Sequence, residues 1–312
     1  MAHKPRWFRD GFVYVSHAET VGINKDGNEL YKIDAATGTR TEDIDDRVAE
    51  DIAHLLVGDE GAHSRWVRSE DYSVGVPAYY SRAYHAPLDA LLSKPAYRGF
   101  KARSLKSLIE SGEIEARHGH GSPSADLRDG EVPYIKVSDI RAGQVNINPT
   151  NMVPRVVAER HWRSRSSGLK AFDLVTPVRA SKNIGEFALL MPGQEDVVVT
   201  KEVLVLRPGK GSAADSFYLL WALSLRVTRE QWKRVVFMQT NREDVGRRYL
   251  EIEIPWAPDK VAADKASESF RTYYSGIEKL RTQFVRSLEA THENYVFLGA
   301  STPEDASGTV NR

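Results

Sequence analysis

Two short polar segments carry side chains that can hydrogen-bond with nucleic-acid bases. They are Arg179-Ala-Ser-Lys-Asn183, close to Gly185, which permits a close approach of the backbone, and Gln239-Thr-Asn-Arg242. Arginine and lysine can donate to guanine O6 and N7, asparagine and glutamine can pair with adenine, and serine or threonine can bind a base or a phosphate. Each segment can equally be a solvated turn, and the residue types alone leave both interpretations open.

Other patterns that could support chemistry are incomplete. His118-Gly-His120 supplies two metal ligands, but no third ligand stands at a suitable spacing. Gly209-Lys-Gly-Ser lacks the upstream glycine of a phosphate-binding loop. Pro258-Asp259 resembles part of a nuclease motif, but its place before a long helical segment favours a helix-entry role for Asp259. We therefore expect no catalytic residue and no metal in this chain.

Composition sets wide bounds. The 312 residues, 41% of them hydrophobic, suffice for one large globular domain or two ordinary ones. The 43 basic residues balance the 43 acidic ones, so attraction to phosphate must come from local clustering. The absence of cysteine excludes disulfides and thiolate chemistry and fits a reducing compartment. Because there is no apolar run of signal or membrane length, we expect a cytoplasmic protein.

Charge is distributed unevenly along the chain. Between Glu42 and Glu60, eight acidic residues accompany one basic residue, Arg47, so this part is expected to contact protein rather than nucleic acid. Basic residues dominate from 155 to 182, and a second basic island extends from 226 to 248. Both basic islands lie in the middle of the chain.

Hydrophobic periodicity and turn residues predict a mixed succession of elements. Asn24-Lys-Asp-Gly27 predicts a hairpin turn, because Asp-Gly supplies the positive φ that such turns need. Gly112 is expected to end a short amphipathic helix. The strands are expected at 12–16, 29–33, 172–178, 187–190, 197–200, 203–206 and 250–254, and the helices at 45–56, 104–110, 216–225, 229–237 and 259–294.

The last of these helices carries an apolar stripe. Its apolar residues recur at spacings of three and four, which places them on one side of an otherwise charged helix. Such a stripe needs a partner, and the partner can be another helix or the chain's own domain. The stripe consists of Phe270, Tyr273, Ile277, Leu280 and Phe284.

The order of motifs in the middle of the chain resembles the specificity subunit of type I restriction-modification systems. Val132-Pro-Tyr-Ile-Lys-Val-Ser-Asp-Ile140 precedes a strand that starts with the pattern aspartate, apolar, apolar at Asp173 and has the basic Arg179 near its end. A segment like 217–224, a strand like 248–255 and a long helix follow in the family's order. The family usually has two recognition domains and two spacer helices, and this chain has one of each, so it resembles half a subunit.

This resemblance implies an α+β fold. Residues 1–60 would form a small N-terminal α/β docking module, 61–78 a linker, and 79–258 a DNA target recognition domain with a small mixed β-sheet and short helices. Residues 259–294 would form one long spacer helix of coiled-coil type, and 295–312 a disordered tail. The chain would then be a non-catalytic subunit that binds double-stranded DNA sequence-specifically in a restriction-modification or phage-defence system.

The resemblance also implies DNA contacts and partners. The two polar segments would enter the major groove, and Arg163, Arg165 and Lys201 would contact phosphates. The partner would be an adenine-N6 methyltransferase subunit that holds S-adenosylmethionine, with a restriction subunit and a second copy of this chain, through the long helix, as further candidates. The DNA-binding set is Arg163, Arg165, Arg179, Ser181, Lys182, Asn183, Lys201, Gln239, Thr240, Asn241 and Arg242.

The N-terminal segment has a second resemblance. Arg9 to Asn28, with the acidic stretch 43–51, is similar to the part that follows the catalytic domain in type I-like adenine-N6 methyltransferases. Those enzymes need an Asn/Asp-Pro-Pro-aromatic motif, and the nearest string here, Asn148-Pro-Thr-Asn151, lacks the second proline and the aromatic residue. Methyl transfer is therefore expected from another chain. Two alternatives stay open: a protein-interaction subunit without DNA contact, and a nuclease or methyltransferase with an unrecognised motif.

Overall fold

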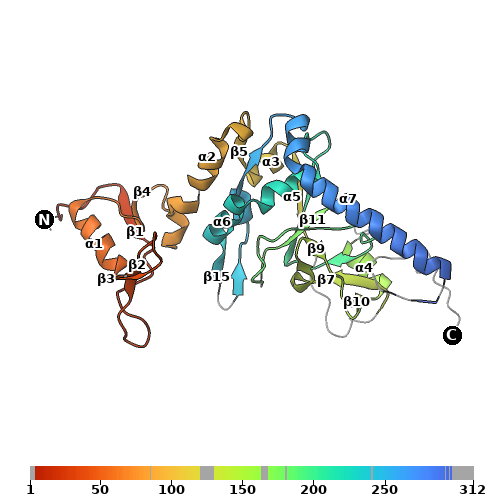
Figure 1. Ribbon diagram of the computed structural model, residues 1–312, viewed down its shortest axis with the longest axis horizontal. Coiled ribbons are helices and arrows are strands. Elements are labelled where there is room, and N and C mark those ends of the chain that lie inside the picture. Colours follow the sequence, from red (N-terminus) through yellow and green to blue (C-terminus); the bar gives the residue numbers. More distant parts are fainter. Residues whose placement is uncertain are drawn as a thin grey trace. The chain divides into compact units, whose positions relative to one another are not determined.

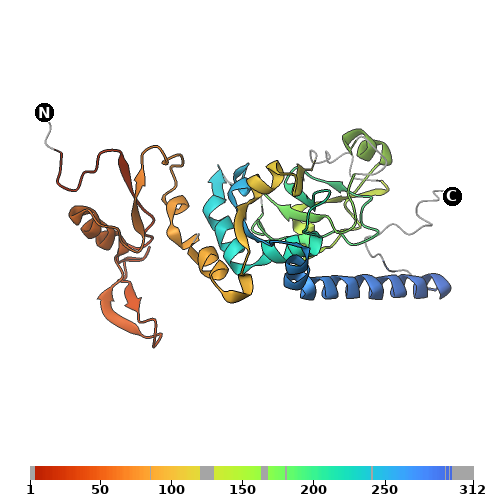
Figure 2. The ribbon, with the colours of Figure 1, turned by 90° about the horizontal axis from the view of Figure 1, so that it is seen from above.

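The chain folds into two compact units, residues 1–84 and 85–312, each described here by itself (Figures 1 and 2). The structure is a computed structural model. It describes residues 4–84, 86–119, 130–162, 168–179, 181–239, 242–291, 293–294 and 296.

The first unit combines two antiparallel strand pairs with one helix. Strand β1 (Phe12–Ser16) pairs with β4 (Ser64–Arg68), and β2 (Tyr31–Ile33) pairs with β3 (Arg40–Ile44), ahead of α1 (Arg47–Val57). The hairpin turn predicted at 24–27 is confirmed, since Gly27 has φ +81° and its N–H donates to the Asn24 carbonyl at 3.0 Å. Short 3₁₀ turns at Pro77–Tyr80 and Arg82–Tyr84 end the unit.

The linker expected at 61–78 contains part of this unit instead. Strand β4 lies in that range, and its Trp66 and Val67 are buried. The Gly-, Ser- and charge-rich flanks concealed this five-residue strand. The division between the units falls after Tyr84.

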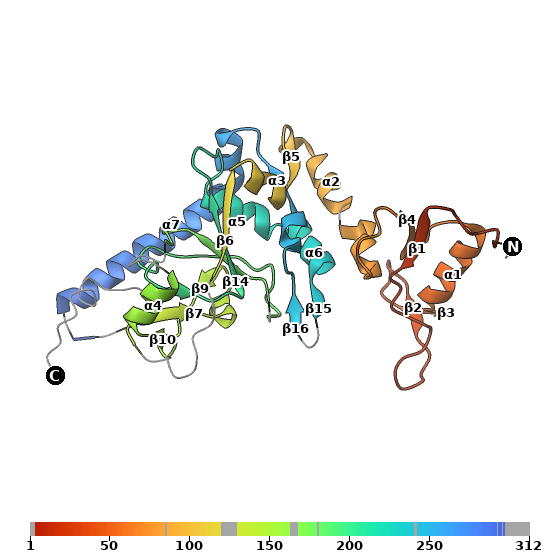
Figure 3. The same cartoon turned by 180° about the vertical axis from the view of Figure 1, so that it is seen from behind.

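The second unit is built on a mixed six-stranded sheet. Its neighbours pair antiparallel except β12 and β9, which are parallel, and Figure 3 shows β6 and β14 side by side. In spatial order the strands are β6 (Ile114–His118), β14 (Val203–Pro208), β11 (Leu174–Pro177), β12 (Ala188–Leu189), β9 (Gln144–Val145) and β8 (Ile140–Arg141).

Smaller strand groups complete the second unit. A three-stranded sheet contains β10 (Met152–Val153), β7 (Val132–Ile135) and β13 (Val198–Val199). A hairpin is formed by β15 (Phe237–Gln239) and β16 (Arg242–Asp244), and β5 (Lys101–Ser104) pairs with β17 (Glu253–Trp256).

The helices predicted in the second unit are confirmed, whereas α2 and α4 were not predicted. The helices are α2 (Ala86–Leu92), α3 (Leu105–Glu110), α4 (Arg155–Trp162), α5 (Ser216–Ser224), α6 (Arg226–Val235) and α7 (Lys260–Thr291), with 3₁₀ turns at Pro95–Tyr97, Val137–Asp139 and Arg248–Glu251. The unit is therefore α+β with one long final helix, as expected.

One strand boundary was predicted wrongly. The segment at 248–251 is a 3₁₀ turn, and β17 begins only at Glu253 and continues through Pro255 to Trp256. A proline is tolerated in β17 because this strand has a single strand neighbour, β5, so one side of its backbone needs no ladder hydrogen bonds.

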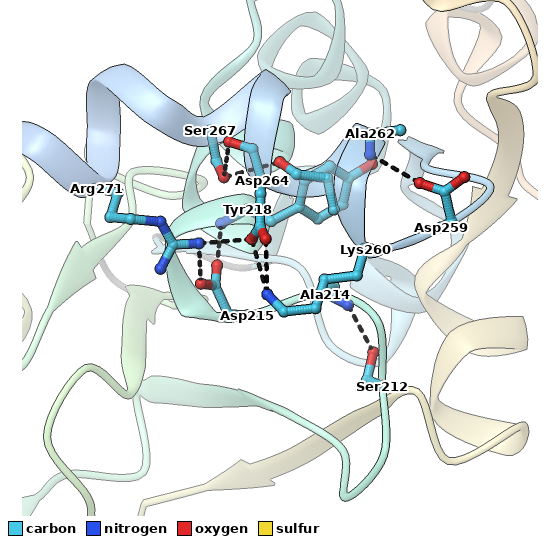
Figure 4. Close-up of polar contacts among 11 residues, drawn as sticks. Ser212, Ala214, Asp215, Tyr218, Asp259, Lys260, Ala262, Asp264, Ser267 and Arg271 are labelled. Carbon is cyan, nitrogen blue, oxygen red and sulfur yellow. Dashed lines mark hydrogen bonds and ion pairs between the residues drawn. The ribbon is translucent and has the colours of Figure 1, made fainter.

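Charged contacts fix the start of α7 against α5 (Figure 4). Asp215 caps α5 by accepting from the Tyr218 N–H at 2.9 Å, and it also pairs with Arg271 of α7. The Arg271 guanidinium donates to Asp264 at 2.8 Å, and Lys260 Nζ lies 2.8 Å from the same carboxylate. The first turns of α7 are thereby held by side chains of both helices.

Neutral hydrogen bonds reinforce this junction. The buried Tyr218 hydroxyl donates to the Pro255 carbonyl at 2.7 Å and accepts from the Ala257 N–H at 2.9 Å. Asp259 accepts from the Ala262 N–H at 2.8 Å, which confirms the helix-entry role predicted for it. The strand before α7 and the helix itself are thus joined to α5 (Figure 4).

Candidate nucleic-acid interface

Three strand ends meet at one edge of the six-stranded sheet. His118 lies opposite Leu204, and Pro177 lies opposite Val203, so the carboxyl ends of β6 and β11 flank the start of β14. The Gly119 N–H donates to the Val203 carbonyl at 3.1 Å. We call residues 118–119, 178–179 and 200–203 the loop edge. Lys201, in the turn that enters β14, is exposed there.

The β15–β16 hairpin joins the loop edge through Arg179. Arg179 forms an antiparallel bridge with Asp244, and its Nε lies 3.0 Å from the Asp244 carboxylate. The Val245 N–H donates to the Val178 carbonyl at 3.0 Å. The side chain of Arg179 is 47% exposed, against 15% for Asp244. Arg179, in the first polar segment, therefore lies against the base of the hairpin that carries the second segment, about sixty positions later in the sequence.

Inside the first polar segment, only some residues face solvent. The Ser181 hydroxyl accepts from the Asn183 N–H at 3.0 Å, and Asn183 Nδ2 donates to the Ile140 carbonyl at 3.4 Å. These two side chains shape the loop, whereas Lys182 is exposed. Gly185 has φ +81°, and a Cβ there would lie 2.6 Å from the Trp232 ring. Packing against Trp232 explains this glycine without any need for an approaching ligand.

Part of the predicted set lies outside the described residues. This applies to Arg163, Arg165, Thr240 and Asn241, and to the side chains of Gln239 and Arg242, whose backbones pair across the hairpin. For the described set, the structure brings together Arg179 and Lys201 near the loop edge.

Helix α6 adds basic residues that were not assigned to the site from the sequence. Arg226, Arg229 and Lys233 are exposed and follow the i, i+3, i+7 spacing that defines one helical face. Arg229 lies 3.4 Å from Glu186, and Lys233 lies 2.6 Å from Glu230. This basic face, 226/229/233, directly precedes the hairpin. The basic island at 226–248 and the helical spacing of its residues could have identified this face from the sequence.

The motif residues at 136–139 build the scaffold. Asp139 is buried and accepts from the Lys136 N–H at 2.8 Å, and Lys136 Nζ donates to Asn151 at 2.7 Å. Burial raises the pKa of Asp139, and the Lys136 N–H and ammonium partly oppose this. This motif therefore fixes the turn after β7.

Asp173 has a similar structural role at the start of β11. It is 1% exposed and accepts from Arg207 Nε at 2.7 Å and from the Lys170 N–H at 2.8 Å. The hydrogen-bonded Asp173 carboxylate raises the pKa of Arg207, against the effect of burial. The ion pair ties β11 to β14, which together carry two sides of the loop edge.

The apolar stripe of α7 is divided between two faces. Phe270 and Ile277 pack partly on the core next to Tyr274, which is 4% exposed and donates to the Gly143 carbonyl at 2.8 Å. Tyr273, Leu280 and Phe284 are 55%, 68% and 44% exposed. The prediction of one continuous five-residue stripe was therefore wrong, because the core takes Tyr274 rather than Tyr273.

Charge separates along the same division as the two units. Residues 1–84 contain 15 acidic and 10 basic residues, and the remainder contains 28 acidic and 33 basic residues. Among the described residues, no group of three or more His, Cys, Asp or Glu side chains could hold a metal ion. Nor does any helix in the described ranges have the length and apolarity to cross a membrane.

Comparisons with known proteins give a faint but consistent likeness. No protein-family model matches the chain, and no curated protein does. Among solved structures it is similar to the type I restriction-modification system S subunit from M. genitalium, with 14% identity and a TM-score of 0.39 over 62% of this chain and 44% of that one. The HsdS subunit from Thermoanaerobacter tengcongensis gives 14% identity and a TM-score of 0.34 over 68% of this chain and 45% of that one.

A third neighbour comes from a structure described by complex assembly and conformational transition of the type I R-M system. It has 12% identity and a TM-score of 0.37, over 67% of this chain and 50% of that one. These neighbours belong to the kind of protein that the sequence motifs resemble, and the chain spans about half their length. Because the TM-scores and identities are low, these likenesses do not assign a function, and the functional proposal is based on the chain's own residues.

Proposed function

We propose that this chain is a non-catalytic subunit that recognises a double-stranded DNA sequence and directs a partner adenine-N6 methyltransferase to it, in a type I-like restriction-modification or phage-defence system. The observation that carries the proposal is the contact between Arg179, in the first polar segment, and Asp244, in the hairpin that carries the second segment. This contact supports a common surface for the two segments, which are distant in sequence, beside the strand ends of the sheet. A two-stranded hairpin is narrow enough to enter the major groove.

Phosphate contacts are assigned to the basic side chains around this surface. Lys201 and Lys182 are exposed there, and the basic face 226/229/233 of α6 leads directly into the hairpin. The net positive charge of residues 85–312 favours nucleic acid, and the net negative charge of residues 1–84 favours a protein partner. Arg163 and Arg165 stay in the proposal as phosphate contacts.

The exposed face of α7, formed by Tyr273, Leu280 and Phe284, is assigned to helix pairing, either with a second copy or with the methyltransferase. Two copies related by a two-fold axis would read a split palindrome, because the symmetry of the protein is mirrored in the site. S-adenosylmethionine would be held by the partner, and a restriction subunit is a further candidate partner.

Duplex binding tests this function directly. Methylome sequencing of cells with and without the gene supplies the candidate motif, and the purified chain is then titrated with duplexes that contain or lack it. We expect tighter binding to the motif duplex, with affinities that fall steeply as salt increases. A methylome that does not change with the gene, or equal binding of the duplexes with and without the motif, would refute the proposal.

A further inference from the structure

Helix α1 exposes a continuous apolar face. Its buried or half-buried face carries two apolar residues, Val48 and Leu55, beside Arg47, Asp51 and His54, and Asp51 is only 3% exposed. The opposite face carries a run of apolar residues at i, i+3, i+4, i+7 and i+8, which is the spacing of a core-facing stripe. Ile52, Leu56 and Val57 in this run are 51%, 59% and 78% exposed. We call this run the α1 stripe; it consists of Ala49, Ile52, Ala53, Leu56 and Val57.

The inward face of α1 is held by polar bonds, so the orientation of the helix is specified. The Asp51 carboxylate accepts from the Ser16 hydroxyl at 2.6 Å and from the Ser64 hydroxyl at 2.8 Å. The Tyr14 hydroxyl donates to the Asp51 carbonyl at 2.8 Å. Rotation of the helix to bury the stripe would break these bonds with both strands β1 and β4 and would leave the Asp51 carboxylate unpaired.

An exposed stripe of this kind marks an interaction surface. Large apolar side chains on a folded unit are stabilised when a partner removes them from water, and contiguous exposed ones are characteristic of binding sites. The chain's hydrophobic core clusters lie in the second unit within the described residues, so the first unit has little apolar burial of its own. Its stability is therefore expected to gain from a bound partner.

Charge selects the partner. At the start of α1, Glu50, Asp43 and Asp45 surround Lys32 and raise its pKa, Glu50 through a direct bond. At the other end of the helix, Asp59 is exposed and the Arg9 guanidinium donates to the Gly58 carbonyl. The net negative charge of residues 1–84 disfavours DNA and anionic membrane surfaces, and a second copy of the unit carries the same net charge. A protein with an apolar groove bordered by lysine and arginine would match both the apolar stripe and the negative charge of the unit.

We infer that the α1 stripe docks into an apolar, basic-rimmed groove of the methyltransferase chain. The inference rests on the proposed function and deepens it, since it assigns the contact to one helix face. The geometry matches helix-in-groove recognition, in which residues at i, i+3, i+4 and i+7 anchor a helix. Residues 1–84 then supply an enzyme contact of their own, apart from the DNA surface of the second unit.

The test uses the full chain and its methyltransferase chain, purified separately and titrated by calorimetry. Ile52→Ala/Leu56→Ala is expected to weaken binding by about a hundredfold, given the apolar area that two truncated side chains would otherwise bury. Both positions are exposed and alanine is the best helix former, so the variant should fold as the parent does. The matched control, Val156→Ala/Val261→Ala, removes side chains that are 70% and 78% exposed in the second unit and should bind unchanged.

The outcomes distinguish an error in the α1 site from an error in the proposed function. If the parent binds the methyltransferase and the stripe variant binds equally well, the α1 site is wrong and the proposed function stands. If the parent binds no methyltransferase, the proposed function itself fails. Self-association of the parent that disappears in the stripe variant would assign the stripe to a second copy and overturn the inference. Duplex binding by the stripe variant should match the parent in every case.

Discussion

Arg179 and Asp244 join the first polar segment to the β15–β16 hairpin through an antiparallel backbone bridge and a 3.0 Å contact between guanidinium and carboxylate. The carboxylate orients the guanidinium, and about half of the arginine side chain stays exposed. An arginine held in this way resembles a preorganised donor for a base edge, because little side-chain freedom remains to be removed on binding.

Arg179→Ala should therefore weaken binding to the motif duplex by about 1–3 kcal/mol, the range for a good bidentate base contact. The loss on a random duplex should be smaller. Competition titrations with both duplexes at one salt concentration measure the two values. An equal loss on both would assign Arg179 to phosphate instead of a base.

Neutralising the basic face of α6 should act differently. The triple variant Arg226→Gln/Arg229→Gln/Lys233→Gln should weaken motif and random duplexes alike, and the salt slope should fall by about 0.9 for each phosphate that the variant no longer neutralises. Lys265→Gln/Lys279→Gln, at exposed positions of α7, is the control. An unchanged slope in the triple variant would remove α6 from the interface.

Asp173→Asn should destabilise the second unit by about 3–5 kcal/mol, because it leaves the Arg207 charge in a largely buried position without its carboxylate partner. Urea unfolding, monitored by tryptophan fluorescence, measures this. Asp196→Asn breaks the more exposed pair with Arg155, at 2.7 Å, and should cost at most about 1 kcal/mol. Comparable costs for both variants would contradict the structural role of Asp173.

The stability of the first unit should depend on pH through His17. Burial lowers the pKa of His17, and the nearby His63 lowers it further, while Asp51 and Glu19 oppose this. The unfolded chain, with a histidine pKa of about 6.5, then binds the proton more readily than the folded one. The free energy of unfolding should fall as pH decreases from 7 through the lowered pKa. His17→Gln should flatten this dependence; an unchanged slope would exclude His17 as its source.

Mutation of the buried face of α7 should lower stability, whereas mutation of its exposed face should lower association. Tyr274→Ala should destabilise the second unit by about 3 kcal/mol, since it removes a buried aromatic side chain and its hydrogen bond. Burial raises the pKa of Tyr274 to about 12, so the hydroxyl remains a donor at neutral pH. Leu280→Asp/Phe284→Asp should leave thermal unfolding unchanged and reduce association. Thermal unfolding measures the stability of both variants, and sedimentation velocity measures their self-association and their binding to the methyltransferase. Association that the two aspartates leave unchanged would exclude the exposed face as a contact.

Local patterns were enough to predict most elements of the second unit. The helix at Ser216–Ser224, the strand at Val203–Pro208 and the cap at Asp259 follow from runs of apolar residues and a capping side chain, which are properties of neighbouring residues. The strand at Ser64–Arg68 was missed because its charged sequence has no strand pattern of its own. It is stabilised by pairing with Phe12–Ser16, which is distant in the sequence.

The candidate site depended more on distant contacts. The sequence selected Arg179 and the segment at 239–242, but their adjacency depends on strand pairing and on Asp244. Ser181 and Asn183 are occupied by loop hydrogen bonds, which residue type cannot reveal. The outward orientation of α1 could not be predicted either, because the buried bonds of Asp51 come from Ser16 and Ser64, far along the chain.

The junction at the base of α7 has a mechanical consequence. A helix of 32 residues is about 48 Å long, so it works as a stiff lever whose fulcrum is the cluster of Asp215, Asp264 and Arg271. Beyond Arg271 the helix continues to Thr291 for about 30 Å, so a tilt of about 5° at that point would move the far tip by about 3 Å. A partner bound near the C-terminal end of α7 would therefore be held at a fixed distance from the sheet, and loss of the Arg271 contacts would make that distance variable.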